Sequence, residues 1–211
     1  MGATQGITQK KISLRYQKSI DVRSTNENLT ICRSVSSQDS IKLGSCYKIA
    51  VLGMNTAVGK TAFICSLINQ TPMVSNLPQT IGLDVKCMLY QQQKIQFWEF
   101  DSSEGGLLDL ENRMNDTFNC IMIIFEQFDV SLFKRRIAQV QKICNENKMT
   151  GKVPIHLIGN DRLDMKISGK EKEIQRMIQT IYDGNRIFVH IVDFTQIKEL
   201  NNLLQFVFKE K

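Results

Sequence analysis

The sequence predicts an α/β fold, a doubly wound, mostly parallel six-stranded sheet with helices on both faces. Three observations predict it. Short, continuous apolar runs alternate with segments of helical periodicity, as in parallel sheets that are buried on both faces. One polar turn, 91–93, separates two alternating runs and predicts a single antiparallel hairpin at an edge. A glycine-rich loop links the first apolar run to a helical segment, at the edge where such sheets bind ligands.

The chain of 211 residues is long enough for one domain and an appendage. Residues 1–45 are rich in Ser, Thr, Gln and Asn, and hold seven Lys/Arg against three Asp/Glu, so that they carry +4 of the net charge of +6. This composition predicts a flexible basic N-terminal extension, followed by a folded domain over 46–211. A solvated tail and a contact with a protein or an acidic surface both remain open for 1–45.

Composition also excludes several classes of protein. The six cysteines have no paired spacing, which favours reduced thiols in an intracellular protein over a disulfide framework or a zinc site. No apolar stretch approaches the length of about 18 residues needed to span a membrane. No aromatic platform accompanies the basic segment, so nucleic acid is not an expected partner. The basic run 134–136 is expected on a solvated helix face, and His156 and His190 are expected in strands as core or edge residues.

The elements follow in order. Ile49 to Leu52 is a continuous apolar run and predicts a buried strand, and the helical segment 62–68 follows the glycine-rich loop. An alternating run follows Thr80-Ile81-Gly82 and continues to Tyr90, and with the run 94–100 after the polar turn it predicts the hairpin. Periodicity predicts the remaining helices, and apolar runs predict the remaining strands. These are helices 107–118, 133–144, 171–182 and 200–208, and strands 120–125, 153–158 and 187–192.

The loop itself carries the strongest motif. Gly53, four residues, and then Gly59-Lys60-Thr61 form the GxxxxGK[ST] pattern of a phosphate-binding loop, typical of P-loop NTPases. Glycines let the backbone N–H groups turn toward phosphate oxygens, and the following helix directs its positive end at the same anion. Lys60 is expected to reach the β- and γ-phosphates and Thr61 to bind Mg²⁺. The predicted phosphate-binding residues are Gly53, Asn55, Thr56, Ala57, Val58, Gly59, Lys60 and Thr61.

With this loop, the sequence resembles the Ras superfamily of small GTPases, most closely the Rab-like branch. The resemblance covers about residues 46–208. Its motifs are Gly53 to Thr61, then Thr80-Ile81-Gly82-Leu83-Asp84, Ile95-Gln96-Phe97-Trp98-Glu99 and Leu157-Ile158-Gly159-Asn160. It implies GTP/GDP and Mg²⁺ as cofactors. It also implies that Thr80 contacts Mg²⁺ and the γ-phosphate from a loop that is ordered in the triphosphate state.

The catalytic region departs from the family pattern after Trp98. Ser102 replaces the glycine that senses the γ-phosphate, and Ser103 replaces the glutamine that orients the attacking water. A serine is too short for that task, so slow intrinsic hydrolysis is expected, with Ser103 and Thr80 in the catalytic positions. The metal residues are predicted as Thr61, Thr80 and Asp101. Glu99 is the alternative carboxylate, because residues two apart on a strand share a face.

The base-reading region departs as well. Asn160 matches the family motif, but Asp164 lies one position beyond the aspartate that accepts hydrogen bonds from guanine. Asn160 and Asp164 are the predicted base-binding residues, with ATP or another nucleotide as the open alternative to GTP.

The sequence thus predicts a Rab-like small GTPase that acts as a molecular switch for effector proteins in intracellular or vesicle trafficking. Effector and regulatory proteins are expected to bind 69–82 and 101–115. A pseudo-GTPase that serves as a non-hydrolysing scaffold is the alternative function. The expected location is cytoplasmic, with peripheral attachment to a membrane or a larger assembly left open.

Overall fold

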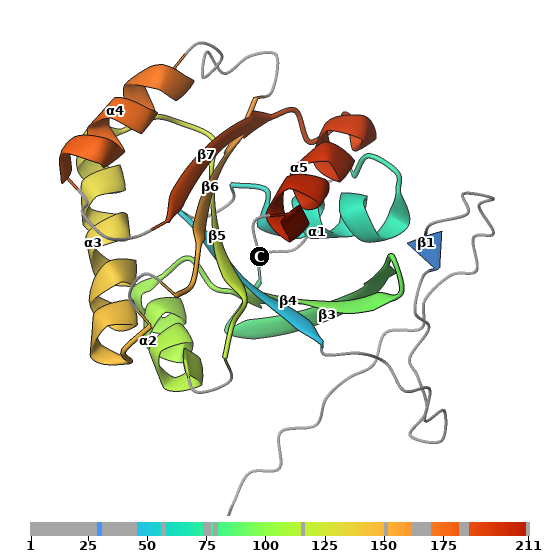
Figure 1. Ribbon diagram of the computed structural model, residues 1–211, viewed down its shortest axis with the longest axis horizontal. Helices are drawn as coiled ribbons and strands as arrows, with labels where there is room; N and C mark the ends of the chain where they lie inside the picture. The colour runs from blue at the N-terminus through green and yellow to red at the C-terminus, as the bar shows by residue number, and fades with distance from the viewer. Residues whose placement is uncertain are drawn as a thin grey trace, which may run out of the picture.

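The computed structural model describes residues 29–30, 46–55, 58–73, 77, 80–114, 117–149, 152–161, 170–181 and 186–209. In these ranges a sheet of strand order β1-β3-β4-β2-β5-β6-β7 lies between two layers of helices (Figure 1). The strands are β1 (Leu29–Thr30), β2 (Tyr47–Gly53), β3 (Leu83–Tyr90), β4 (Gln93–Phe100), β5 (Cys120–Phe125), β6 (Ile155–Asn160) and β7 (Ile187–Val192). The helices are α1 (Lys60–Asn69), α2 (Glu104–Arg113), α3 (Val130–Glu146), α4 (Glu171–Ile181) and α5 (Ile197–Lys209).

The predicted fold class is confirmed. Strands β4, β2, β5, β6 and β7 pair in parallel, and β3 pairs antiparallel with β4 as the predicted hairpin. These are the six expected strands. The two-residue β1 adds to them because its backbone pairs antiparallel with Leu89 and Tyr90 of β3. It lies within 1–45, and the boundary between a flexible extension and a folded domain remains a prediction.

Both faces of the sheet are apolar and covered, which explains the continuous apolar runs. In β2, Ala50 and Leu52 pack on the face covered by α2, α3 and α4, whereas Ile49 and Val51 pack on the face covered by α1 and α5 (Figure 1). All four side chains are fully buried. The central strand is therefore packed from both sides up to its carboxyl end, where the glycine-rich loop begins.

The hairpin turn is shorter than the sequence predicted. Gln91 and Gln92 alone form the turn, with φ values of 47° and 62°, and Gln93 already pairs with Tyr90. Positive φ at both central residues is the pattern of a two-residue turn that matches the twist of the flanking strands. Gly or Asn adopts this conformation more readily than Gln does, so three consecutive glutamines do not mark which two residues form the turn.

The described part of the chain also shows where the cysteines and histidines lie. None of the five cysteines described there forms a disulfide, and Cys120 and Cys144 are buried. His156 is a core residue, because it is fully buried. None of the described helices is long and apolar enough to cross a bilayer.

Candidate phosphate-binding site

The glycine-rich loop joins the carboxyl end of β2 to the first turn of α1. Gly59 has φ +80°, a left-handed conformation that favours glycine, and it is the N-cap of α1. A Cβ on Gly53 would lie 2.3 Å from Ser102 Oγ and 2.7 Å from the carbonyl oxygen of Asn55, so only glycine fits there. No side chain caps the helix, and the N–H groups of its first turn are available to an anion. Asn55 is exposed and Val58 is buried, while Thr56 and Ala57 lie outside the described residues.

Lys60 begins α1 and is buried under the loop. Its Nζ donates a hydrogen bond to Ser102 Oγ over 2.7 Å. Burial lowers the pKa of Lys60, and the nearby carboxylates of Glu99 and Asp101 act in the opposite direction. A buried ammonium with one neutral hydroxyl partner has donor capacity left for anionic oxygens, as a phosphate-binding lysine requires.

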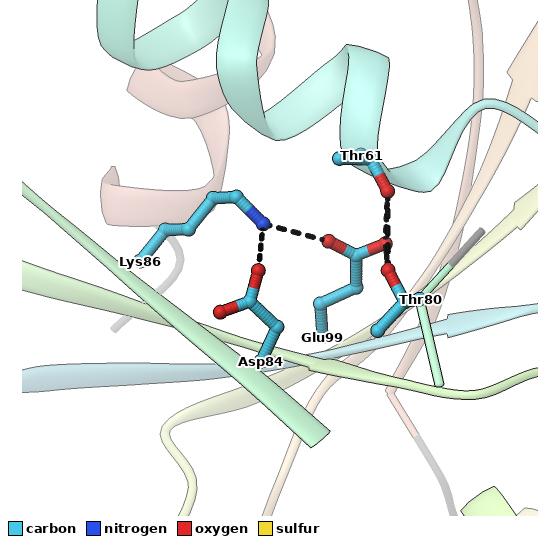
Figure 2. Close-up of polar contacts among 5 residues, drawn as sticks. All are labelled: Thr61, Thr80, Asp84, Lys86 and Glu99. Carbon is cyan, nitrogen blue, oxygen red and sulfur yellow. Dashed lines mark hydrogen bonds and ion pairs between the residues drawn. The ribbon is translucent and has the colours of Figure 1, made fainter. Parts of the chain in front are cut away.

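Thr61, Thr80 and Glu99 form a hydroxyl–carboxylate cluster beside the loop, drawn in Figure 2. Glu99 Oε1 accepts hydrogen bonds from Thr61 Oγ1 at 2.5 Å and from Thr80 Oγ1 at 2.6 Å, and the two hydroxyl oxygens lie 3.2 Å apart. Thr61 comes from α1, Thr80 precedes β3, and Glu99 stands near the end of β4. Three separate segments thus converge on one fully buried carboxylate.

Lys86 closes the cluster on its other side. Its Nζ contacts Glu99 Oε2 at 3.1 Å and also pairs with Asp84 of the same strand (Figure 2). Burial by itself lowers the pKa of Lys86, but hydrogen bonds to Asp84 and Glu99 and their charges outweigh burial, so the net shift is upward. The buried charge of Glu99 is therefore balanced by a protonated partner.

Asp101 and Ser103 lie together at the start of α2 and bind each other. The two Asp101 carboxylate oxygens accept from Ser103 N at 3.3 Å and from Ser103 Oγ at 2.9 Å. Ser103 is exposed and is the N-cap of α2. In this arrangement Asp101 fixes the turn that starts α2, and Glu99 is the carboxylate that the structure brings to Thr61 and Thr80.

Arg136 of α3 reaches under the loop from the opposite face. The expected solvated position is wrong for this residue, because Arg136 is only 5% exposed. Its Nη2 donates to the carbonyl oxygen of Ser102 at 2.7 Å and to that of Met54 at 3.4 Å. Burial lowers its pKa. Arg136 therefore ties the start of α2 to the glycine-rich loop, whereas Lys134 and Arg135 are exposed as expected.

Asn160 ends β6 and is fully buried. Its Nδ2 donates to Glu126 Oε1 at 3.1 Å, and a Cβ on Gly59 would lie 3.5 Å from that nitrogen and 3.6 Å from that carboxylate oxygen. Both side chains therefore lie against the loop. Asp164, the other predicted base-binding residue, lies outside the described residues.

Three residues that contact the candidate site were not predicted from the sequence: Lys86, Arg136 and Glu126. Lys86 carried a usable signal, since it shares a strand face with Asp84 and pairs in the hairpin opposite the strand that holds Glu99. Arg136 and Glu126 carried none, because their roles depend on how distant elements pack.

The donors present fit Mg²⁺ and a phosphate chain. Mg²⁺ prefers oxygen ligands, with one or two carboxylates completed by waters and phosphates, and Thr61, Thr80 and Glu99 offer two hydroxyls and one carboxylate. Lys60 and the uncapped first turn of α1 offer donors to phosphate. The described residues hold no group of three His, Cys, Asp or Glu side chains that would make a metal site without a phosphate ligand.

Comparison with known proteins gives a structural match and no sequence match. No protein-family model and no curated protein match the chain. The structure is similar to that of the Arl6 BBS3 small GTPase from Trypanosoma brucei, solved with the bound nucleotide analogue GppNp. The TM-score is 0.59 at 14% identity, over 79% of this chain and 97% of that chain. The chain therefore has the fold of the small GTPases.

Proposed function

We propose that the chain is a molecular switch of the small-GTPase type that binds GTP and GDP with Mg²⁺. The observation that carries the proposal is the convergence of Thr61 and Thr80 on Glu99 beside the glycine-rich loop. A loop alone offers phosphate binding, but this cluster adds a magnesium site and couples it to the segment around Thr80. Loss of the terminal phosphate could then release that segment, as a switch requires.

Guanine is the preferred base in this proposal. The family resemblance in the motifs supports it, and so does the structural neighbour, which was solved with GppNp. The position of Asn160 at the carboxyl end of β6 supports its assignment. Membership of the Rab-like branch and a role in intracellular or vesicle trafficking rest on the resemblance of the motifs alone.

Hydrolysis is slow in this proposal. The Ser103 hydroxyl is bonded to Asp101 and its short side chain replaces the glutamine that orients water. Lys60 and the first turn of α1 would hold the phosphate oxygens, and Thr61, Thr80 and Glu99 would hold Mg²⁺, which supplies charge neutralisation when bound.

Partner proteins would bind the segments 69–82 and 101–115. Two large apolar side chains support this assignment, because Ile81 is 91% exposed and Leu108 is 57% exposed. Exposed apolar side chains on adjacent segments mark surfaces that associate with other proteins.

Nucleotide binding by the purified full-length chain tests the proposal. Its bound nucleotide is identified after denaturation, and labelled GDP, GTP and ADP are titrated with Mg²⁺. Lys60→Ala should abolish tight binding, while Lys152→Ala, which changes an exposed lysine, should leave it intact. Tight guanine-nucleotide binding that depends on Lys60 supports the switch. Absence of binding in a folded protein would instead favour the scaffold, and a preference for ADP would favour an adenine-nucleotide protein.

A further inference from the structure

Ser102 is the residue whose position distinguishes this site most sharply from a plain phosphate loop. It is 5% exposed, and its hydroxyl accepts the hydrogen bond of Lys60 over 2.7 Å. The same oxygen stands so close to Gly53 that a Cβ there would be 2.3 Å away. The hydroxyl therefore lies against the loop and takes up a donor that a phosphate would use.

The backbone of Ser102 is held as firmly as its side chain. Arg136 Nη2 donates to its carbonyl oxygen at 2.7 Å, and the same nitrogen reaches the carbonyl oxygen of Met54 in the loop. The Nε and Nη1 atoms of Arg136 are buried without a hydrogen-bond partner among the described residues. Movement of Ser102 away from the loop would remove the shorter of these two hydrogen bonds and leave a buried cation still less satisfied.

The order of the strands decides which phosphate meets Ser102. The loop follows β2, with β4 on one side and β5 and β6 on the other. In the proposed function the base lies toward the end of β6, whereas Ser102 follows β4 on the opposite side of the loop. A phosphate chain that runs from the base across the loop reaches Ser102 with its last phosphate.

We infer that Ser102 makes the site selective for nucleoside diphosphates over triphosphates, an inference that rests on the proposed function. A diphosphate leaves the hydrogen bonds of Ser102 to Lys60 and Arg136 in place. A triphosphate must displace the hydroxyl from Lys60 and draw the Ser102 backbone away from Arg136. The chain thus holds its diphosphate state by contacts between its own residues.

The ratio of two dissociation constants tests this inference. Fluorescent GDP and GppNp are titrated with Mg²⁺ into the full-length chain, and the Kd for GppNp is divided by the Kd for GDP. In the wild type this ratio should be about ten or more, because a hydrogen bond to a charged group must be broken. Ser102→Gly and Ser102→Ala should each lower the ratio about tenfold, mainly by tightening GppNp.

The control is Ser131→Ala, which removes an exposed serine hydroxyl of α3 and should leave the ratio unchanged. Thermal melting establishes that each variant is folded. A wild-type ratio near one, or a ratio that neither Ser102 variant changes, overturns the inference and leaves the proposed function standing. Absence of binding of both nucleotides to the folded wild type refutes the proposed function itself, and the inference with it.

Discussion

Replacement of Glu99 by glutamine should raise the Mg²⁺ concentration needed to retain a bound nucleotide, and Asp101→Asn should not. The sequence makes both carboxylates candidates for the magnesium site, but in the structure they bind different residues. Glu99 Oε1 accepts from Thr61 and Thr80, whereas the Asp101 carboxylate accepts from Ser103. Glutamine has nearly the same size as glutamate, so Glu99→Gln removes the charge with little change in packing.

The magnitude follows from the contacts. Residues that orient metal ligands typically change metal affinity by about 10- to 100-fold when they are replaced. If the glutamine oxygen still accepts from the threonines, its NH₂ group faces the Lys86 ammonium, so two donors meet and the hydrogen bond to Lys86 is lost. Breaking a buried ion pair costs about 3–5 kcal/mol, and the lower end applies here, because Lys86 keeps Asp84 and is 21% exposed. A loss of about 3 kcal/mol lowers Tm by roughly 6–12 °C for a domain of this size.

The assay measures the release rate of fluorescent GDP while Mg²⁺ is varied and finally chelated. Glu99→Gln should shift the Mg²⁺ midpoint upward by about 10- to 100-fold, and Asp101→Asn should keep it within about threefold of the wild type. With Mg²⁺ chelated, the release rates of the wild type and Glu99→Gln should converge. An equal or larger shift for Asp101→Asn would refute the assignment of Glu99.

Three further predictions concern stability. Gly106→Ala should destabilise the protein by about 3 kcal/mol, because a Cβ there would lie 1.8 Å from a backbone oxygen at the start of α2. Gly105→Ala, where only a side-chain oxygen is near, should stabilise it by about 0.5–1 kcal/mol. Urea unfolding measures both free energies. Gln92→Gly should raise the free energy of unfolding by about 0.5–1 kcal/mol, because the residue has φ 62°, and an unchanged or lower Tm would contradict this. His156 and His190 are in contact at 3.1 Å, and burial lowers their pKa values to about 3 and about 4, below the unfolded value of 6.5. The unfolded chain therefore binds protons first, so stability should fall as the pH drops from 6.5 toward 4, by about 2 kcal/mol per histidine at pH 5. His156→Leu should reduce this fall, and an identical pH profile would count against it.

The order of elements could be predicted from the sequence because burial on two faces gives each strand a continuous apolar run. The residues at which helices begin and end were harder to predict. The expected helix 107–118 is α2, which begins at Glu104 and ends at Arg113. Periodicity detects the residues that face the core, such as Leu107 and Leu110. The helix start depends instead on the extended backbone of Ser103 and its bonds to Asp101, which periodicity does not detect.

The choice between Glu99 and Asp101 shows that the alternation of side chains along a strand cannot be applied beyond the end of the strand. Alternation along a strand places residues two apart on one face, and this made the two carboxylates equivalent in the sequence. Strand β4 ends at Phe100, so Asp101 lies outside the pleat and turns toward α2. The rule requires both residues to be in the strand, and one residue beyond its end was enough to separate the two side chains.

The residues that match the family motifs make different contacts at the two ends of the candidate site. At the predicted phosphate end, Lys60 contacts Ser102 and Thr61 contacts Glu99, so α1 is linked to the end of β4 and the start of α2. At the predicted base end, the Asn160 amide is bound to Glu126 and lies against Gly59. Asn160 therefore packs against the glycine-rich loop through contacts within the chain. It follows that the match at Asn160 is stronger evidence for an intact phosphate loop than for a guanine pocket, and that base selectivity has to be measured separately from phosphate binding.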